Sequence, residues 1–189
     1  MSEEELTVGI QKGMELGKIF AESGIFPDVK TASQGYVKIL AGRELNMTPM
    51  QSLNAFYFIA GKIGITSNAV ASLVKTSKKY DYSVKTNTES ECTLVFYKGE
   101  EVLGESTFTF KDAAKAGLVN KDVWKNYPRN MLFARALMNG VRWYCPDAIS
   151  GGMYSVEELD DLTPAKINKV VTITEDGEVR NDEELKETV

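Results

Sequence analysis

Two arginines in the second half of the chain have the residue type and the spacing to bind an anion. Arg135 and Arg142 are seven positions apart in a segment rich in basic and aromatic residues, Trp124–Pro146. At about 100° per residue they would lie about 20° apart on one helix face, with Asn139 between them. Guanidinium groups bind phosphates through planar, bidentate donors. The spacing therefore predicts a phosphate-binding face, although arginines on helices also commonly form ion pairs with neighbouring carboxylates.

Other cations and aromatic residues extend this candidate site. Arg129 would point about 120° away from Arg135, so we expect it to serve the helix start or a subunit interface. Trp124 and Tyr127 precede the helix and could either stack on bases or anchor the core. Lys62 is expected at a hairpin tip, where it could aid solubility or contact a ligand. The remaining candidate cations are Lys111, Lys115 and Lys125.

The arginine-bearing segment is predicted to be one long helix, from about 128 to 145. Pro128 suits the first turn, where no amide hydrogen is needed, and Pro146 cannot continue a helix. The face opposite the arginines is apolar and includes Phe133 and Leu137. We expect Trp143 to be buried as well.

The remaining segments predict an α+β fold. Periodicity and caps indicate helices at 6–21, at 34–45 after Ser33, from Thr48-Pro49, at 68–79 after Ser67, and at 111–118. Three glycines inside the first helix should weaken it. Strand-like runs occur in a hairpin at 56–66 and at 82–85, 92–97 and 105–110. We expect a small antiparallel sheet of about five strands packed against helices, with the arginine-bearing helix at the centre.

The residue inventory excludes most familiar catalytic sites. Histidine is absent, and only Cys92 and Cys145 are available as thiols, which we expect to be reduced packing residues. No phosphate-binding Gly-x-x-x-x-Gly-Lys-Ser/Thr loop is present. We therefore expect no metal, no cofactor and no enzymatic activity. The acidic pairs are interpreted as solvated charge in loops or tail: Glu100-Glu101, Glu157-Glu158 and Asp160-Asp161.

Charge is distributed unevenly along the chain, whose net charge is −5. Residues 6–147 carry 18 basic and 13 acidic groups, or +5, whereas residues 148–189 carry 4 basic and 11 acidic groups, or −7; three glutamates at the N-terminus supply the remaining −3. A polyanion responds to the local field of a binding face and not to the average charge. The pattern predicts one α+β domain at 1–159 and an acidic, mobile tail at 160–189.

Two sequence patterns predict local structure after residue 150. Ser155 is followed three residues later by Glu158, which is typical of a capped helix start. Within the tail, 170–173 could form a strand that turns at Asp176-Gly177, although a lone hairpin is marginal in water. The tail could compete with a ligand for the basic face or dock a partner protein.

We expect a cytoplasmic protein with no membrane contact. No run of eighteen apolar residues occurs, and the first residues, Met1–Glu5, are acidic where a secretory signal would be basic.

Several blocks in a fixed order resemble the phage-type RecT recombinases of the RecT/Redβ superfamily. The resemblance covers roughly residues 15–159. The blocks are Ala41–Leu53, the Gly61-Lys62 hairpin, Thr107–Phe110 followed by Lys111–Leu118, and Trp124–Ala136 continuing to Pro146-Asp147.

This resemblance implies a single-strand annealing protein. Such proteins bind one DNA strand along a basic groove and pair it with its complement without ATP, through an annealed duplex intermediate. They form homo-oligomeric rings or helical filaments and work in a bacterial or archaeal cell beside a phage exonuclease or a host single-strand-binding protein. The alternative from the residues alone is a non-enzymatic phage or prophage scaffold that docks partners through its acidic tail.

Overall fold

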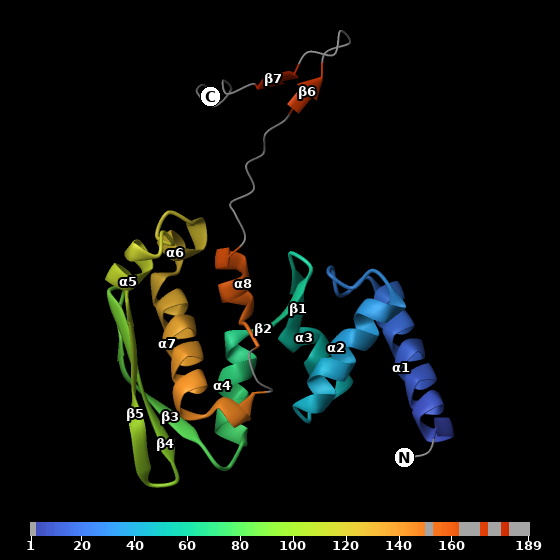
Figure 1. The fold of residues 1–189 in the computed structure, drawn as a ribbon, viewed down its shortest axis with the longest axis horizontal. Coiled ribbons are helices and arrows are strands. Elements are labelled where there is room, and N and C mark those ends of the chain that lie inside the picture. Colours follow the sequence, from blue (N-terminus) through green and yellow to red (C-terminus); the bar gives the residue numbers. More distant parts are fainter. Residues whose placement is uncertain (1–2, 150–152, 163–170, 174–178, 182–189) are drawn as a thin grey trace.

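The structure, a computed structural model of the chain, describes residues 3–149, 153–162, 171–173 and 179–181. It is an α+β protein whose elements form two parts, and the short helix α8 (Val156–Leu162) lies between them (Figure 1). This confirms the predicted fold class at the level of α+β.

The N-terminal part is a helical hairpin followed by a short helix and a β-hairpin. Two reciprocal capping boxes begin its second and third helices, Thr31 with Gln34 and Thr48 with Gln51. Each satisfies amides that a helix start leaves without partners. The cap at Thr31 replaces the predicted cap at Ser33. The elements are α1 (Glu3–Ser23), α2 (Ala32–Glu44), α3 (Pro49–Ala55), β1 (Phe56–Ile59) and β2 (Lys62–Ile65).

The glycines of α1 let it approach α2 closely. A Cβ added to Gly17 would lie 2.2 Å from the carbonyl oxygen of Ala32, and one added to Gly35 would lie 2.7 Å from the Cα of Gly17. Glycine is therefore required at these positions by helix packing, which the sequence did not indicate.

The C-terminal part is a three-stranded sheet with a long helix on one face. Ser106 of the sheet donates a 2.7 Å hydrogen bond to the carbonyl of Ala136 on this helix. Figure 1 shows α7 running along the sheet, with α4 on its other side. The elements are α4 (Ser67–Thr76), β3 (Asp81–Asn87), β4 (Glu91–Lys98), β5 (Glu101–Thr109), α5 (Phe110–Lys115), α6 (Asp122–Asn126), α7 (Pro128–Tyr144), the 3₁₀ turn η1 (Pro146–Ala148) and α8 (Val156–Leu162).

Further along the chain, β6 (Val171–Ile173) and β7 (Val179–Asn181) pair antiparallel. The first matches the predicted strand at 170–173. The turn predicted at Asp176-Gly177 lies outside the described residues.

The main core lies between α7 and the sheet. Leu137, Met138 and Val141 of α7 are fully buried, as are Leu94 and Phe96 of β4. The predicted helix at 128–145 is therefore confirmed, with its apolar face against the sheet as expected. Both cysteines are free and buried, in agreement with the sequence analysis.

The prediction of one sheet with about five strands was wrong. β1 and β2 form a sheet of their own, and β3, β4 and β5 form a separate one. Their strands were identified correctly, but strand sequences do not encode which strands become neighbours. In the chain, α4 lies between the hairpin and the first strand of the sheet.

The hairpin turn falls one residue earlier than predicted. Ala60 and Gly61 both have positive φ, 48° and 77°, and Ile59 pairs with Lys62. Lys62 is therefore the first residue of β2 and stands beside the tip instead of occupying it.

Candidate functional site

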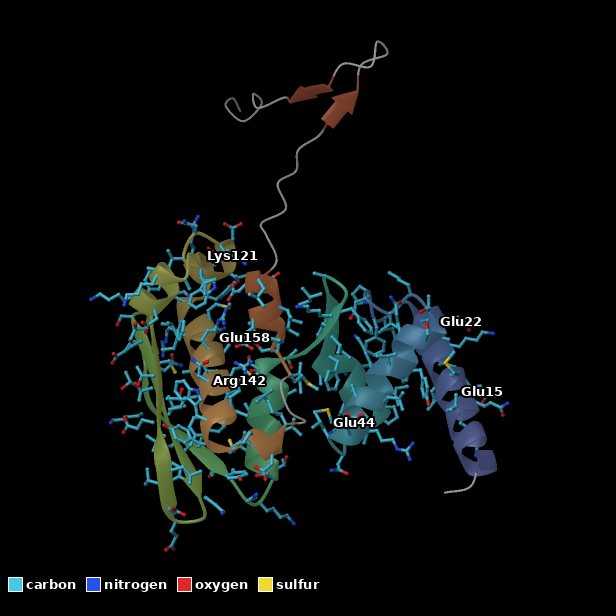
Figure 2. The ribbon with its side chains drawn as sticks, viewed as in Figure 1. Glu15, Glu22, Glu44, Lys121, Arg142 and Glu158 are labelled. Carbon is cyan, nitrogen blue, oxygen red and sulfur yellow. The ribbon has the colours of Figure 1, made fainter. Side chains whose placement is uncertain are left out.

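Arg142 on α7 is held by a carboxylate of α8. Its Nη1 and Nη2 atoms donate bidentate hydrogen bonds of 2.7 and 2.6 Å to Glu158. Figure 2 shows the two residues facing each other across the space between α7 and α8. The guanidinium also donates to the carbonyl oxygen of Met153 at 3.3 Å.

Arg135 is held by the same helix, one turn further on. Its Nη2 donates to Asp161 at 2.7 Å, and its Nη1 lies 3.6 Å from Glu158. The two predicted phosphate-binding arginines therefore share one face, as the spacing indicated. In this conformation, however, that face is covered by α8 and neutralised by two carboxylates.

Asp161 joins this network to the segment before α7. It accepts a 3.0 Å hydrogen bond from Nε1 of Trp124, and Nζ of Lys121 lies 3.5 Å away. Its side chain is 1% exposed. α8 also runs to Leu162, three residues past the predicted domain boundary at 159.

The interpretation as solvated charge was wrong for Glu157, Glu158 and Asp161, whereas Glu100, Glu101 and Asp160 are exposed as expected. Glu158 is buried and completes a capping box, because its carboxylate accepts from the amide of Ser155 and its amide donates to the Ser155 hydroxyl. Glu157 accepts from the hydroxyl and amide of Ser67 at the start of α4. The capping prediction at Ser155 and Glu158 is confirmed, and hydrogen bonds explain why the carboxylates of Glu157 and Glu158 are not free.

The charges in the network are stabilised mutually. Burial by itself would raise the pKa of Glu158, but hydrogen bonds from Arg142 and the Ser155 amide, and the charges of Arg142 and Arg135, outweigh it. The pKa of Glu158 consequently lies below its usual value. The hydrogen bonds with Glu158 also raise the pKa of Arg142, against the opposing effect of burial. Both groups are therefore charged at neutral pH.

Trp143 is placed opposite to expectation, whereas Trp124 takes one of the two roles that the sequence left open. Trp143, expected to be buried, is 59% exposed. Trp124 is fully buried, near Phe108, so its ring is a core anchor and is not available for base stacking in this conformation. Asn139, between the arginines, is half-buried.

Five of the predicted site residues remain accessible at one end of the C-terminal part. We call this surface the basic end. Tyr127 is 63% exposed. The four cations of the basic end are also exposed and form no ion pair with any described side chain. Figure 1 shows α5, α6 and the start of α7, which carry these residues, together at the end of the sheet. The basic end comprises Lys111, Lys115, Lys125, Tyr127 and Arg129.

Lys62 lies on the other side of α8, on the β-hairpin. Its side chain is exposed, and its Nζ stands 5.9 Å from the ring centroid of Tyr154. The same ring lies 5.7 Å from Cζ of Arg142. Figure 1 shows α8 between the β1–β2 hairpin, which carries Lys62, and the end of the molecule formed by α5 and α6.

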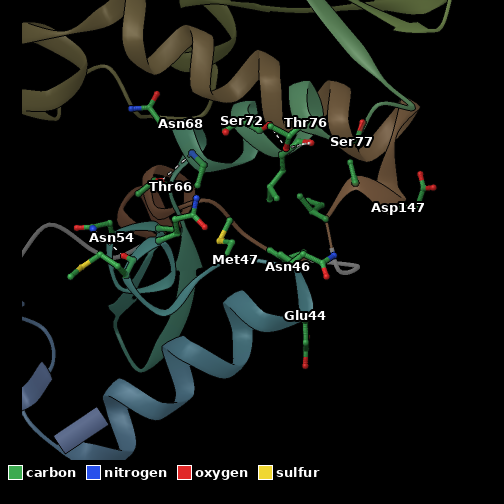
Figure 3. A pocket seen from close by; sticks show the side chains of 18 of the residues that line it. Glu44, Asn46, Met47, Asn54, Thr66, Asn68, Ser72, Thr76, Ser77 and Asp147 are labelled. Carbon is green, nitrogen blue, oxygen red and sulfur yellow. Dashed lines mark hydrogen bonds between the residues drawn. The ribbon is translucent and has the colours of Figure 1, made fainter. Parts of the chain in front are cut away.

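A pocket of about 920 Å³ opens between the N-terminal part and α4 (Figure 3). None of the predicted site residues lines it. Its polar groups are mainly amides and hydroxyls, including Asn46, Asn68 and Ser72, and its two charged residues are the carboxylates Glu44 and Asp147. Because no lysine or arginine lines the pocket, it is poorly suited to phosphate.

The described residues contain no grouping of three or more His, Cys, Asp or Glu side chains that could ligate a metal. In that same part of the chain, no helix has the length and apolar character needed to cross a membrane.

The chain matches no protein-family model, no curated protein and no solved structure. Its function must therefore be inferred from its own residues and geometry.

The sequence analysis missed the carboxylates of α8 and Lys121. A signal for the carboxylates was present. Glu158 and Asp161 are three residues apart, so they lie on one helix face, as Arg135 and Arg142 do on theirs. Two such faces are complementary in charge, but only a folded structure shows that they meet.

Proposed function

We propose that the protein binds single-stranded DNA and anneals complementary strands without ATP, as phage-type annealing proteins do in homologous recombination. The observation that carries the proposal is the basic end, where four cations and an exposed tyrosine lie together without ion pairs among the described residues. Such a surface suits a polyanion that is tracked through its phosphates, with stacking on an aromatic ring. The block resemblance to RecT recombinases supports the same conclusion.

The strand is proposed to contact α5, α6 and the start of α7. Lys125, Tyr127 and Arg129 lie within five consecutive positions, at the junction of α6 and α7. The start of α7 adds the positive end of a helix dipole, which favours phosphate. Lys62 on the neighbouring hairpin would extend the path, whereas Arg135 and Arg142 would serve the fold. The protein is proposed to act as a homo-oligomer beside an exonuclease or a single-strand-binding protein.

Binding of a labelled oligonucleotide at increasing salt tests the proposal. Each phosphate contact to a single strand contributes about 0.7 to the slope of log affinity against log salt. The double variant K125A/R129A should therefore lower that slope by roughly 1.4 and weaken binding by about tenfold or more near physiological salt. Annealing of two complementary oligonucleotides without ATP should weaken in parallel.

Lys98→Ala is the matched control for these variants. Lys98 is also exposed and without an ion pair among the described residues, but it ends β4 at the turn opposite α5 and α6 (Figure 1). K98A should bind as the unaltered protein does. Absence of binding at low salt would refute the proposed function, and equal losses in K98A and K125A/R129A would refute the proposed surface.

A second candidate function, a protein-interaction scaffold, is favoured by one observation. The helical hairpin exposes large apolar side chains, among them Leu16 at 38% and Ile19 at 59%, which lie three positions apart on α1. Exposed apolar side chains that are neighbours on one helix face commonly mark protein contacts. Ile19→Glu should then abolish self-association in light scattering. Self-association without any DNA affinity would favour the scaffold over the annealing protein.

A further inference from the structure

Asp161 is the meeting point of three donors from separate positions in the chain. Trp124 in α6 and Arg135 in α7 each donate a hydrogen bond to its carboxylate, at 3.0 and 2.7 Å. Lys121, just before α6, places its Nζ 3.5 Å away and donates to the carbonyl oxygen of Asp160 at 2.7 Å. One carboxylate of α8 therefore ties α6 to α7.

α6 depends on tertiary contacts for its position, and burial of the Trp124 ring in the core supplies one of them. The helix is five residues long, and its N-cap residue, Lys121, makes no side-chain cap hydrogen bond. A helix this short does not persist without tertiary contacts, because nucleation costs more than so few internal hydrogen bonds return. Its fully buried residue, Trp124, is the one whose indole N–H binds Asp161.

We infer that Asp161 is a positioning residue for strand binding. By holding Trp124 and Lys121 it fixes α6, and with it the orientation of Lys125, Tyr127 and Arg129 at the basic end. A preorganised binding surface loses less conformational entropy on association than one that must first order. This inference rests on the proposed function and identifies the carboxylate that maintains the proposed surface.

The same geometry disfavours a strand that replaces α8 on the arginine face. Phosphates there would have to displace Glu158 and Asp161, whose side chains are 5% and 1% exposed, and uncover the indole of Trp124. Charges already paired in a buried site are costly to separate. The strand therefore passes over α6, while α8 stays in place on the arginine face of α7.

Asp161→Asn tests the inference because two effects predict opposite signs. Removing a negative charge near the basic end, and freeing Arg135 and Lys121, should by electrostatics alone tighten DNA binding. Loss of positioning should instead weaken binding, by about tenfold, with the salt slope unchanged because the phosphate contacts are the same. Affinity for a labelled single-stranded oligonucleotide across a salt series decides between the two.

Asp160→Asn is the matched control. Asp160 is exposed and adjacent, and the substitution changes the charge equally, but its side chain makes no interaction with the described residues. D160N should bind equally or slightly more tightly. Asp161→Glu provides a milder, charge-preserving variant, which should also weaken binding because its carboxylate is displaced by one methylene.

Hydrogen exchange measures the positioning itself. Amides at 118–127 should exchange faster in D161N and D161E than in D160N, without DNA present. Unchanged exchange at 118–127 in both Asp161 variants, or D161N binding at least as tightly as D160N, would overturn the inference. If the unaltered protein binds no oligonucleotide at low salt, the proposed function fails, and the exchange result still decides whether Asp161 holds α6.

Discussion

Arg142 and Glu158 illustrate how the surroundings of a charged residue decide its contribution. An exposed ion pair contributes about 0–1 kcal/mol, whereas removing one partner of a buried pair costs about 3–5 kcal/mol. Glu158 belongs to the second class, because its side chain is 5% exposed and its oxygens accept from Arg142 and the Ser155 amide. Arg135 and Arg142 of α7 therefore have a structural role, because their ion pairs with the carboxylates of α8 hold the two helices together.

The stability that these ion pairs contribute should depend on pH through Glu158. Because its pKa in the folded protein lies below the ordinary value, Glu158 contributes stability above about pH 4.5, and this contribution is lost as the pH falls through the lowered pKa. Glu158→Gln should lower stability by about 3 kcal/mol at pH 7. The difference between the two proteins should shrink towards pH 3, in thermal unfolding followed by circular dichroism.

Other carboxyl groups do not confound this comparison, since both proteins retain them. Asp112 and Asp147, for example, also have lowered pKa values, through hydrogen bonds with Thr109 and Lys79. A stability difference that stays constant from pH 7 to pH 3 would contradict the assigned role of Glu158.

At the scale of elements, α1 and α2 pack through glycines. Helix propensity alone makes each glycine unfavourable by about 1 kcal/mol relative to alanine. The approach at Gly17 and Gly35 reverses that preference, because a Cβ has no room beside the opposing backbone. α1 is therefore specified by its contact surface more than by its propensity.

Two substitutions of the same kind in α1 should have opposite signs. Gly9→Ala should stabilise the protein by up to about 1 kcal/mol, since nothing lies within 4 Å of the new Cβ. Gly17→Ala should destabilise it by about 1–3 kcal/mol through overpacking against Ala32. Urea denaturation midpoints would measure both, and shifts in the same direction would contradict the packing explanation.

At the scale of the whole molecule, charge is separated along the chain and partly recombined by folding. The acidic residues of α8 neutralise cations of α7, which leaves the basic end as a cationic surface with no ion pair to any described residue. Residues 163–189 carry four basic and seven acidic groups, a net charge of −3. Their charge could oppose that of the basic end over a distance set by salt.

Deleting residues 163–189 should tighten DNA binding at low salt. The expected gain is a few-fold at about 0.01 M salt, where the Debye length is about 30 Å, and it should vanish at about 0.15 M. The deletion begins after Leu162 so that Asp161 and α8 remain intact. Unchanged affinity at low salt would dismiss competition by the acidic segment and favour its use in docking a partner.

The sequence by itself determined the local structure. The limits of α7 follow from Pro128 and Pro146, and the start of α3 follows from Thr48-Pro49, because proline geometry and capping act within a few residues. The strands of the sheet were predicted for the same reason, since a run of strand-prone residues is a local signal.

Only the tertiary structure decided which segments meet. The pairing of Glu158 with Arg142, the burial of Trp124 with exposure of Trp143, and the division of the strands into separate sheets each depend on residues distant in the sequence. A helical spacing places two arginines on one face, but the identity of the group that covers this face is set by long-range packing. For that reason we propose the basic end, and not the arginine-bearing face of α7, as the DNA-binding surface.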